Sequence, residues 1–95
     1  MALVARTVEP GHALGGSLSE VACQIRADGG VAVEIGVDLA DPDARSSIVA
    51  HATEALGGPN EILVNNAAAA IYAPPSELAT RHARLMFEIN VLAPL

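Results

Sequence analysis

Two periods of apolar residues alternate along the chain, one typical of strands and one typical of helices. Residues 2–5 form a short apolar run that Arg6 ends, and this run predicts a buried strand almost at the first residue. Residues 7–16 contain one proline and three glycines without any period, which predicts a long surface loop. The first helical period begins only after this loop.

A helix is predicted over residues 18–27. Ser17 and Glu20 have the spacing of a capping box, in which two side chains satisfy backbone N–H groups at the start of a helix. Two glycines at positions 29 and 30 end the helix. Its apolar residues recur at i, i+3, i+4 and i+7, and they are Leu18, Val21, Ala22 and Ile25.

The period changes from that of a helix to that of a strand at Val31. Apolar residues alternate with others over residues 31–37, which predicts an edge strand with one covered face and one partly open face. Asp41 followed by Pro42 is typical of a helix start, and Gly57 with the next glycine ends that helix. Its buried stripe is predicted to consist of Ile48, Ala52, Ala55 and Leu56.

A third strand and a third helix complete the pattern. Residues 62–64 are continuously apolar, which is typical of a parallel strand buried on both faces. Thr80 can cap a last helix that runs to the region of Pro94. Strands that alternate with helices predict an α/β fold with a parallel sheet and crossover connections. The inward residues of the last helix are predicted to be Ala83, Met86, Phe87 and Val91.

Composition limits the chain to one globular unit or a part of one. It has 95 residues, of which 52% are hydrophobic and 17% are charged, so it is too apolar for a disordered tail and too short for two domains. The formal charge of −6 disfavours nucleic acid and anionic membrane surfaces as partners. The first residues lack the pattern of a signal peptide, and the longest uncharged apolar run, residues 67–73, is too short to span a bilayer.

The three histidines and the one cysteine of the chain are scattered without the spacing of a metal-ligand set. We therefore expect no metal site. A single cysteine excludes an internal disulfide and favours a cytoplasmic location. This residue lies beside the apolar stripe of the first helix, where we expect a packed, inert thiol. The four residues are His12, Cys23, His51 and His82.

Four short motifs resemble those of the short-chain dehydrogenase/reductase family and follow the family's order. Residues 61–68, Glu-Ile-Leu-Val-Asn-Asn-Ala-Ala, resemble the strand-end signature D-I-L-V-N-N-A-G. Asp38-Leu39 follows an alternating strand, as the family's adenine-pocket pair does. Asn90-Val91 has the setting N-V-x-x-P/G of a helix-borne asparagine of the family. Arg6-Thr7 stands where the family discriminates between nicotinamide cofactors, and residues 16–20 look most like the hydroxysteroid-dehydrogenase-like branch.

The resemblance implies a partial doubly wound, Rossmann-type sheet, whose strand order in the complete fold is 3-2-1-4-5-6. Residues 1–95 would form a single partial dinucleotide-binding domain, from the family's second strand to its fifth helix. The family's loop T-G-x-x-x-G-x-G and its catalytic Ser and Tyr-x-x-x-Lys have no counterpart here. Without the central first strand, residues 62–64 would lack a ladder partner, and unpaired backbone groups cost roughly 1–3 kcal/mol each.

The resemblance also implies roles in binding a nicotinamide cofactor. Arg6, with Thr7 beside it, would bind the 2′-phosphate of NADP, because an enzyme that uses NAD presents a carboxylate at this place. Asp38 would accept a hydrogen bond from the adenine amine while Leu39 packs on the ring. The alternatives are a solvated cation for Arg6 and an ordinary turn residue for Asp38. NADP is favoured over NAD.

The segment after the predicted third strand is implied in the same site. Asn65 and Asn66 would cap the strand end, and the backbone beside the second asparagine, at Ala67, would line the adenosine ribose. Asn90 is implied in catalysis, because the family's asparagine bends its helix and its carbonyl holds a water of the proton relay. An ordinary polar position in a helix is the alternative for Asn90.

Two functions remain open from the sequence. The first is a fragment of an NAD(P)-dependent short-chain oxidoreductase, which transfers hydride between the nicotinamide cofactor and a carbonyl or alcohol of a small-molecule substrate. This chain alone is then expected to be inactive, and the complete enzyme is expected to be a homo-oligomer. The alternative is a non-catalytic nucleotide-binding or interaction module.

Overall fold

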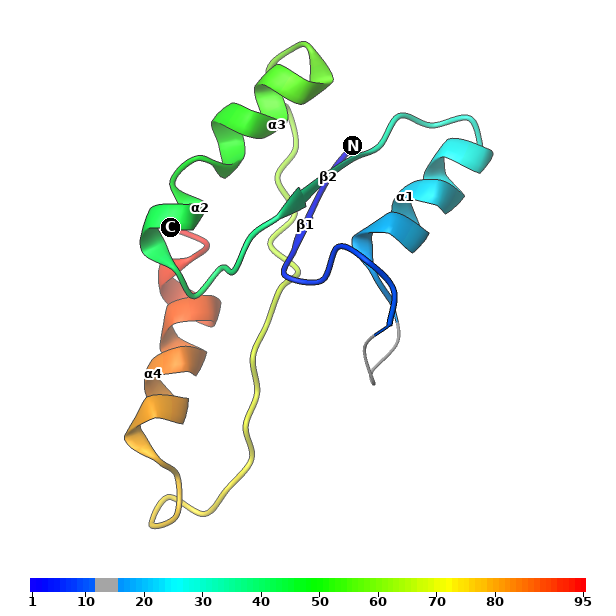
Figure 1. Cartoon of the computed structure of the whole chain (residues 1–95). Helices are drawn as coiled ribbons and strands as arrows, with labels where there is room; N and C mark the ends of the chain where they lie inside the picture. The colour runs from blue at the N-terminus through cyan, green and yellow to red at the C-terminus, as the bar shows by residue number, and fades with distance from the viewer. Residues whose placement is uncertain (12–15) are drawn as a thin grey trace.

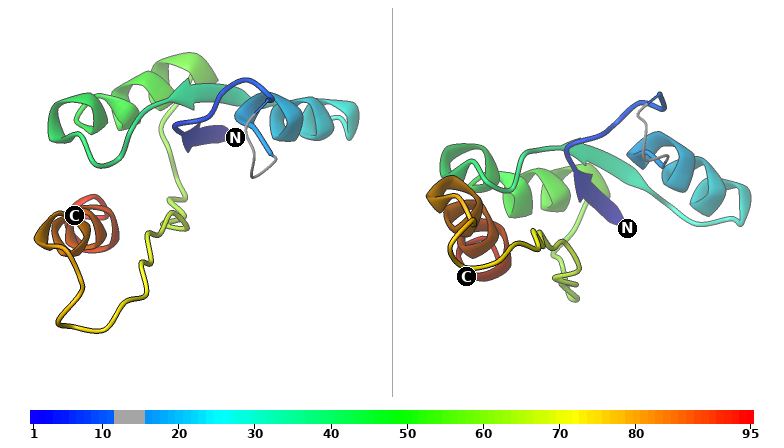
Figure 2. Two further views of the ribbon diagram at one scale, coloured as in Figure 1. Left: turned by 60° about the horizontal axis from the view of Figure 1, so that its bottom comes forward. Right: turned by 90° about the horizontal axis from the view of Figure 1, so that it is seen from below.

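The fold is built on a two-stranded parallel sheet with helices on both of its faces (Figures 1 and 2). The computed structural model describes residues 1–11 and 16–95. Strand β1 (Ala2–Ala5) pairs with strand β2 (Val33–Gly36), and the register runs from Ala2 opposite Val33 to Ala5 opposite Gly36. The predicted α/β class, a partial Rossmann-type sheet with parallel strands, is confirmed.

Helix α1 (Leu18–Ala27) has the predicted bounds. The Ser17 hydroxyl accepts a hydrogen bond from the Glu20 N–H at 3.2 Å and donates one to the Glu20 carboxylate at 3.1 Å. Leu18 and Ala22 of the predicted apolar stripe are buried and Ile25 is half-buried, but Val21 is 48% exposed, so the prediction is wrong for that residue. Residues 12–15 of the predicted loop, among them His12, lie outside the described residues.

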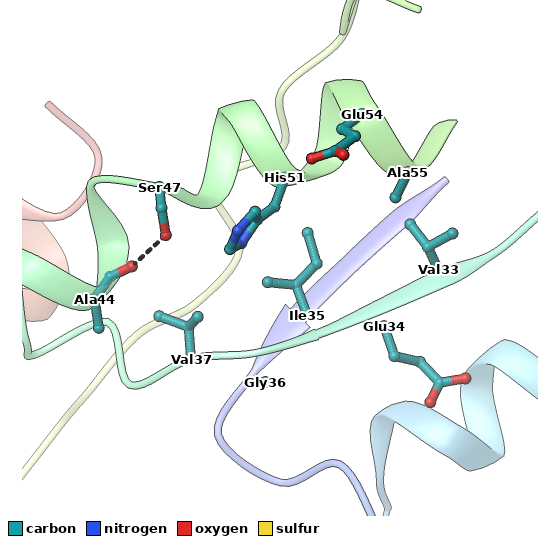
Figure 3. A pocket seen from close by; sticks show the side chains of 10 residues that line it. All are labelled: Val33, Glu34, Ile35, Gly36, Val37, Ala44, Ser47, His51, Glu54 and Ala55. Carbon is teal, nitrogen blue, oxygen red and sulfur yellow. Dashed lines mark hydrogen bonds between the residues drawn. The ribbon is translucent and has the colours of Figure 1, made fainter. Parts of the chain in front are cut away.

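Alternate residues of β2 face opposite helices. Figure 3 shows Val33 and Ile35 directed toward helix α3 (Ile48–Leu56) and Glu34 directed toward α1. The Glu34 carboxylate accepts a hydrogen bond from Arg26 of α1 at 3.0 Å. Because side chains alternate along a strand, a single residue step separates the face toward α3 from the face toward α1.

The predicted second helix is broken into two, α2 (Pro42–Arg45) and α3. The Asp41 carboxylate accepts hydrogen bonds from two backbone N–H groups of α2, which confirms the predicted helix start. At the break, the Ser46 hydroxyl donates to the Asp43 carbonyl at 2.7 Å and the Ser47 hydroxyl donates to the Ala44 carbonyl at 3.1 Å. Serine hydroxyls that bond backbone carbonyls compete with helical hydrogen bonds, which explains the interruption.

The predicted third strand does not form. Ile62, Leu63 and Val64 are 84%, 73% and 77% exposed. A strand needs a neighbour for its backbone N–H and carbonyl groups, and no strand of the described residues lies beside these three. The connecting segment (residues 58–79) instead runs without helix or strand from α3 to helix α4 (Thr80–Phe87), as Figures 1 and 2 show. Tyr72 within it is 95% exposed.

This open segment makes the molecule less compact than its length allows. The radius of gyration is 15.2 Å. A compact domain of this length has a radius of gyration of about 12 Å. The difference arises because α4 lies apart from the sheet, at the far end of the connecting segment (Figure 2).

The last helix begins and faces differently from the prediction. Its N-cap is Ala79, with no side-chain capping bond, so Thr80 does not cap it. Helix α4 continues into the π-helix η1 (Glu88–Leu92). Phe87 is 57% exposed, and Ala83 and Val91 are exposed too, so only Met86 of the predicted inward residues is half-buried. The inward face is set by the connecting segment, and it consists of His82, Leu85, Met86 and Ile89.

Cys23 of α1 is exposed, so the predicted packed thiol is wrong. It follows the buried Ala22 by one position, and one position turns a helix by about 100°, which carries the side chain away from the sheet. None of the helices in residues 1–11 and 16–95 is long and apolar enough to cross a membrane.

We predict that Gly36→Ala destabilises the fold by about 1–2 kcal/mol, the usual cost of overpacking. A Cβ at this position would lie 2.6 Å from Cγ2 of Val8, which is too close for two carbon atoms. Urea unfolding followed by circular dichroism measures the effect. In the Val8→Ala background the cost should disappear. Gly58→Ala is the matched control, because a Cβ there meets nothing within 4 Å. Equal losses in Gly36→Ala and Gly58→Ala would contradict the prediction.

Candidate functional site

The carboxyl ends of β1 and β2 lie at the same edge of the sheet because the two strands are parallel. The Val37 N–H donates to the Ala5 carbonyl at 3.0 Å, which continues the pairing past the end of β2. Ligands of doubly wound folds bind outside the carboxyl ends of the strands. The predicted site residues that follow these two strands form the carboxyl edge, which consists of Arg6, Thr7, Asp38 and Leu39.

The chain after β1 closes onto the start of α1 and leaves Arg6 exposed. The Thr7 carbonyl accepts a hydrogen bond from the Leu18 N–H at 3.0 Å, and the Val8 carbonyl accepts one from the Ser19 N–H at 3.0 Å. The Ser19 hydroxyl donates to the same Val8 carbonyl at 2.7 Å. Within the described residues Arg6 makes no ion pair and no side-chain hydrogen bond.

Asp38 is exposed and stabilises a turn at the end of β2. One of its carboxylate oxygens accepts a hydrogen bond from the Ala40 N–H at 2.9 Å. Asp38 is thus the turn residue that the sequence offered as an alternative, and the turn uses one of its two carboxylate oxygens. Leu39 is half-buried, and its carbonyl accepts a hydrogen bond from Arg45 at 3.0 Å. This arrangement keeps an acidic and an apolar side chain next to each other at the carboxyl edge.

Asn65, Asn66 and Ala67 are exposed in the connecting segment. The predicted capping of a strand end by the asparagines is wrong, because residues 62–64 form no strand. The backbone N–H of Asn66 donates to the Val64 carbonyl at 3.1 Å, which is a local turn. In the described part of the chain, no hydrogen bond joins these three residues to β1 or β2. The structure therefore brings the carboxyl edge together but leaves the asparagine pair outside it.

Asn90 holds the connecting segment with both ends of its side-chain amide. Its carbonyl oxygen accepts a hydrogen bond from the Ala69 N–H at 2.9 Å, and its NH₂ donates to the Ala69 carbonyl at 2.8 Å. A residue of a neighbouring strand would bond a backbone in the same two-way manner. The sequence reasoning missed this pairing. An asparagine side chain can form such a pair, but the amino-acid sequence does not indicate which backbone residue it will bond.

The backbone carbonyl of Asn90 has no helical partner. In an α-helix the N–H four residues later would donate to it, but that residue is Pro94, which has no N–H. The next N–H, that of Leu95, donates to the Leu92 carbonyl at 3.3 Å. The turn closes instead between the Ala93 N–H and the Glu88 carbonyl at 2.8 Å. π-Helical turns occur often at functional sites, and within residues 1–11 and 16–95 no hydrogen bond reaches the Asn90 backbone carbonyl.

A second connection missed from the sequence links α2 to η1. Arg45 pairs with Glu88 at 2.5 Å, and their side chains are 18% and 25% exposed. The same guanidinium nitrogen donates to the Leu39 carbonyl of the carboxyl edge. The two charged residues are 43 positions apart, and no local pattern in a sequence indicates such a pair.

An open hollow lies between β2 and α3, with Ser47, His51 and Glu54 along one side (Figure 3). The Ser47 hydroxyl donates to the Ala44 carbonyl, and no hydrogen bond among the described residues joins it to His51 or Glu54. The three side chains therefore form no nucleophilic relay. No group of three or more His, Cys, Asp and Glu side chains in residues 1–11 and 16–95 is placed to hold a metal ion.

Comparisons with known proteins match almost the whole chain. Residues 6–95 match the family model for short chain dehydrogenases. Hydroxysteroid dehydrogenase-like protein 2 of Bos taurus is 36% identical over 88 residues, which cover 93% of this chain and 21% of that protein. The Xenopus laevis protein of the same name gives the same identity and coverage, and the Danio rerio protein is 35% identical over 89 residues. The chain thus spans about a fifth of the length of these curated relatives. The resemblance found from the motifs is confirmed.

We predict that Asn90→Leu releases the connecting segment, because leucine has nearly the same shape but neither donates to nor accepts from Ala69. The loss should be about 1 kcal/mol, the net worth of hydrogen bonds that solvent can replace. Chymotryptic cleavage after the exposed Tyr72, followed by mass spectrometry, should accelerate about fivefold. Asn60→Leu is the control, because it removes bonds to Thr53 and Val49, both of which belong to α3. The prediction is wrong if both variants accelerate cleavage equally.

Proposed function

Because the chain belongs to the short-chain dehydrogenase family, we propose that it is part of an NAD(P)-dependent oxidoreductase that acts on a carbonyl or alcohol of a small molecule. In this proposal residues 1–95 form one partial dinucleotide-binding domain. The observation that supports it best is the parallel register of β1 and β2, which gathers Arg6, Thr7, Asp38 and Leu39 at one edge. The names of the relatives, hydroxysteroid dehydrogenase-like proteins, agree with a dehydrogenase.

The residues of the carboxyl edge fit the adenosine end of a nicotinamide dinucleotide. Arg6 is an exposed guanidinium without a protein partner among the described residues, which suits a phosphate group. Asp38 uses one carboxylate oxygen in its turn, and the other can accept a hydrogen bond from an adenine amine. The half-buried Leu39 beside it can pack against the adenine ring.

We propose NADP rather than NAD as the cofactor, with NAD as the alternative. The guanidinium of Arg6 forms a fork of N–H donors that matches the oxygens of a 2′-phosphate. A carboxylate at this place would instead bond the 2′-hydroxyl of NAD and repel a phosphate. Thr7 contributes a side-chain hydroxyl next to Arg6. Asn65, Asn66 and Ala67 are proposed to line the ribose once a neighbouring strand orders the connecting segment.

When bound, the nicotinamide supplies or accepts the hydride. Asn90 is proposed as a catalytic residue whose open backbone carbonyl holds a water of the proton relay. Two features of the chain support this role. Pro94 removes the N–H that would occupy the carbonyl, and the side-chain pair with Ala69 fixes the turn in place. A homo-oligomeric enzyme in the cytoplasm belongs to the same proposal.

We predict that Arg6→Asp reduces the preference for the 2′-phosphate. The ratio of the dissociation constants of 5′-AMP and 2′,5′-ADP should fall by about one to two decades, because a charge-assisted contact is replaced by repulsion. Ligand-observed NMR on the chain measures both constants. Arg81→Asp on α4 is the matched control for the change in net charge, since Arg81 is also exposed. An unchanged ratio in Arg6→Asp would remove Arg6 from the site.

We predict that this chain alone transfers no hydride with NADP or NAD and a panel of carbonyl compounds. General acid catalysis needs a positioned group of suitable pKa, and the 95 residues contain no lysine to complete a Tyr-x-x-x-Lys motif. Nicotinamide absorbance followed over time measures the rate. Turnover that scales with the purified chain would overturn the assigned roles. Nucleotide binding without turnover in a chain extended by both family motifs would favour the non-catalytic binding module.

A further inference from the structure

Two arginines of the chain each bridge a backbone carbonyl and a glutamate carboxylate, and we call such a bridge a fork. Arg26 forms it through three guanidinium nitrogens, whereas Arg45 uses Nη1 for both bonds. Arg26 of α1 donates to the Ala32 carbonyl and pairs with Glu34 at 3.0 Å, so it joins α1 to β2 and to the residue just before that strand. Arg45 of α2 donates to the Leu39 carbonyl and pairs with Glu88. The partners of Arg45 are further apart in the fold, because Leu39 belongs to the carboxyl edge and Glu88 belongs to the last helix.

The Arg45 fork is the only polar side-chain link, within the described residues, from the sheet and helices α1–α3 to α4 and η1. The other hydrogen bonds that join α4 and η1 to the preceding chain involve the connecting segment, at Ala69, Ile71 and the N-cap residue Ala79. The link joins Arg45, the last residue of α2, to Glu88, the first residue of η1. The side chains of Arg45 and Glu88 are mostly buried, so solvent screens their attraction less than that of an exposed pair.

The link ends at the two parts of the proposed site. On one side, Arg45 holds the carbonyl of Leu39, the residue after Asp38. On the other side, Glu88 is the first residue of η1, and its backbone carbonyl closes the π-helical turn with the Ala93 N–H. Asn90 lies two residues further along that turn. A shift of Glu88 therefore moves Asn90, because both belong to one short hydrogen-bonded turn.

We propose that Arg45 is a positioning residue that sets Asn90 relative to the carboxyl edge. Arg45 contacts neither Asn90 nor the proposed cofactor. It acts through Glu88 on one side and through Leu39 on the other. The inference that this edge is a cofactor site rests on the proposed function. A nucleotide that orders the turn at Asp38 and Leu39 then also tightens the turn of Asn90, and the coupling is reciprocal.

The test observes the side-chain amide of Asn90 directly. The chain has four asparagines, so nitrogen-labelled asparagine gives few NMR signals. Exchange of the Asn90 NH₂ with water reports its bond to the Ala69 carbonyl. The Asn60 NH₂, which donates to the Thr53 hydroxyl at 2.8 Å and to the Val49 carbonyl at 3.3 Å, is an internal control, because both partners belong to α3 and neither takes part in the Arg45 fork.

In Arg45→Met and in Glu88→Gln, exchange of the Asn90 NH₂ should rise about fivefold while exchange of the Asn60 NH₂ stays unchanged. Arg26→Met removes the matched fork and should leave Asn90 unchanged. The double variant with Arg45→Glu and Glu88→Arg restores the opposite charges but not the bond to the Leu39 carbonyl, because a carboxylate cannot donate to it, so Asn90 exchange should fall below that of either single variant without reaching the original rate. Unchanged Asn90 exchange in both single variants would overturn the proposal. So would a parallel rise at Asn60, because Arg45 would then stabilise the whole fold.

Addition of 2′,5′-ADP separates this proposal from the proposed function. In the original chain the nucleotide should slow exchange of the Asn90 NH₂ about twofold or more, and in Arg45→Met it should not. A nucleotide that alters no signal in any variant would overturn the proposed cofactor site, while the exchange rates without nucleotide would still decide the role of Arg45.

Discussion

The parallel pairing of β1 with β2 is the contact on which the arrangement of the other residues depends. Four residues of each strand pair in register, and the alternation of side chains along β2 then assigns one face to α1 and the other to α3. The same register makes both strands end at one edge. Arg6 and Asp38 are 32 positions apart in sequence, yet each follows its strand at the same end of the ladder.

Local signals predicted the parts of the fold that need only local contacts. Ser17 with Glu20 and Asp41 with Pro42 begin helices because each cap satisfies backbone groups a few residues away. The run of residues 62–64 has an equally clear strand pattern but forms none. A strand is stabilised by a neighbour, which an apolar run alone does not reveal. The expected lack of a ladder partner for residues 62–64 came from the family resemblance, and the two-stranded sheet agrees with it. The face of α4 was misjudged for the same reason, since the connecting segment decides which side is covered.

The candidate site also has a part that could be predicted from the sequence and a part that could not. The carboxyl edge followed from the sequence, because strand ends and parallel pairing place Arg6 and Asp38 without any knowledge of side-chain contacts. The pairs Asn90 with Ala69 and Arg45 with Glu88 did not follow, because they join residues 21 and 43 positions apart and have no periodicity. Such contacts depend on where the chain returns in space. These two contacts also connect the last helix to the rest of the molecule. The position of Asn90, the proposed catalytic residue, therefore could not be predicted from the sequence.

The exposure of Tyr72 determines which optical methods can follow this protein. It is the only tyrosine, the chain has no tryptophan, and its ring is 95% exposed in the connecting segment. Its surroundings therefore change little when the sheet and helices come apart. Tyrosine fluorescence from the chain therefore reports the surroundings of Tyr72 in the connecting segment and changes little when the rest of the fold unfolds. A fluorescent reporter of the fold has to be introduced near the β1–β2 ladder, where burial changes.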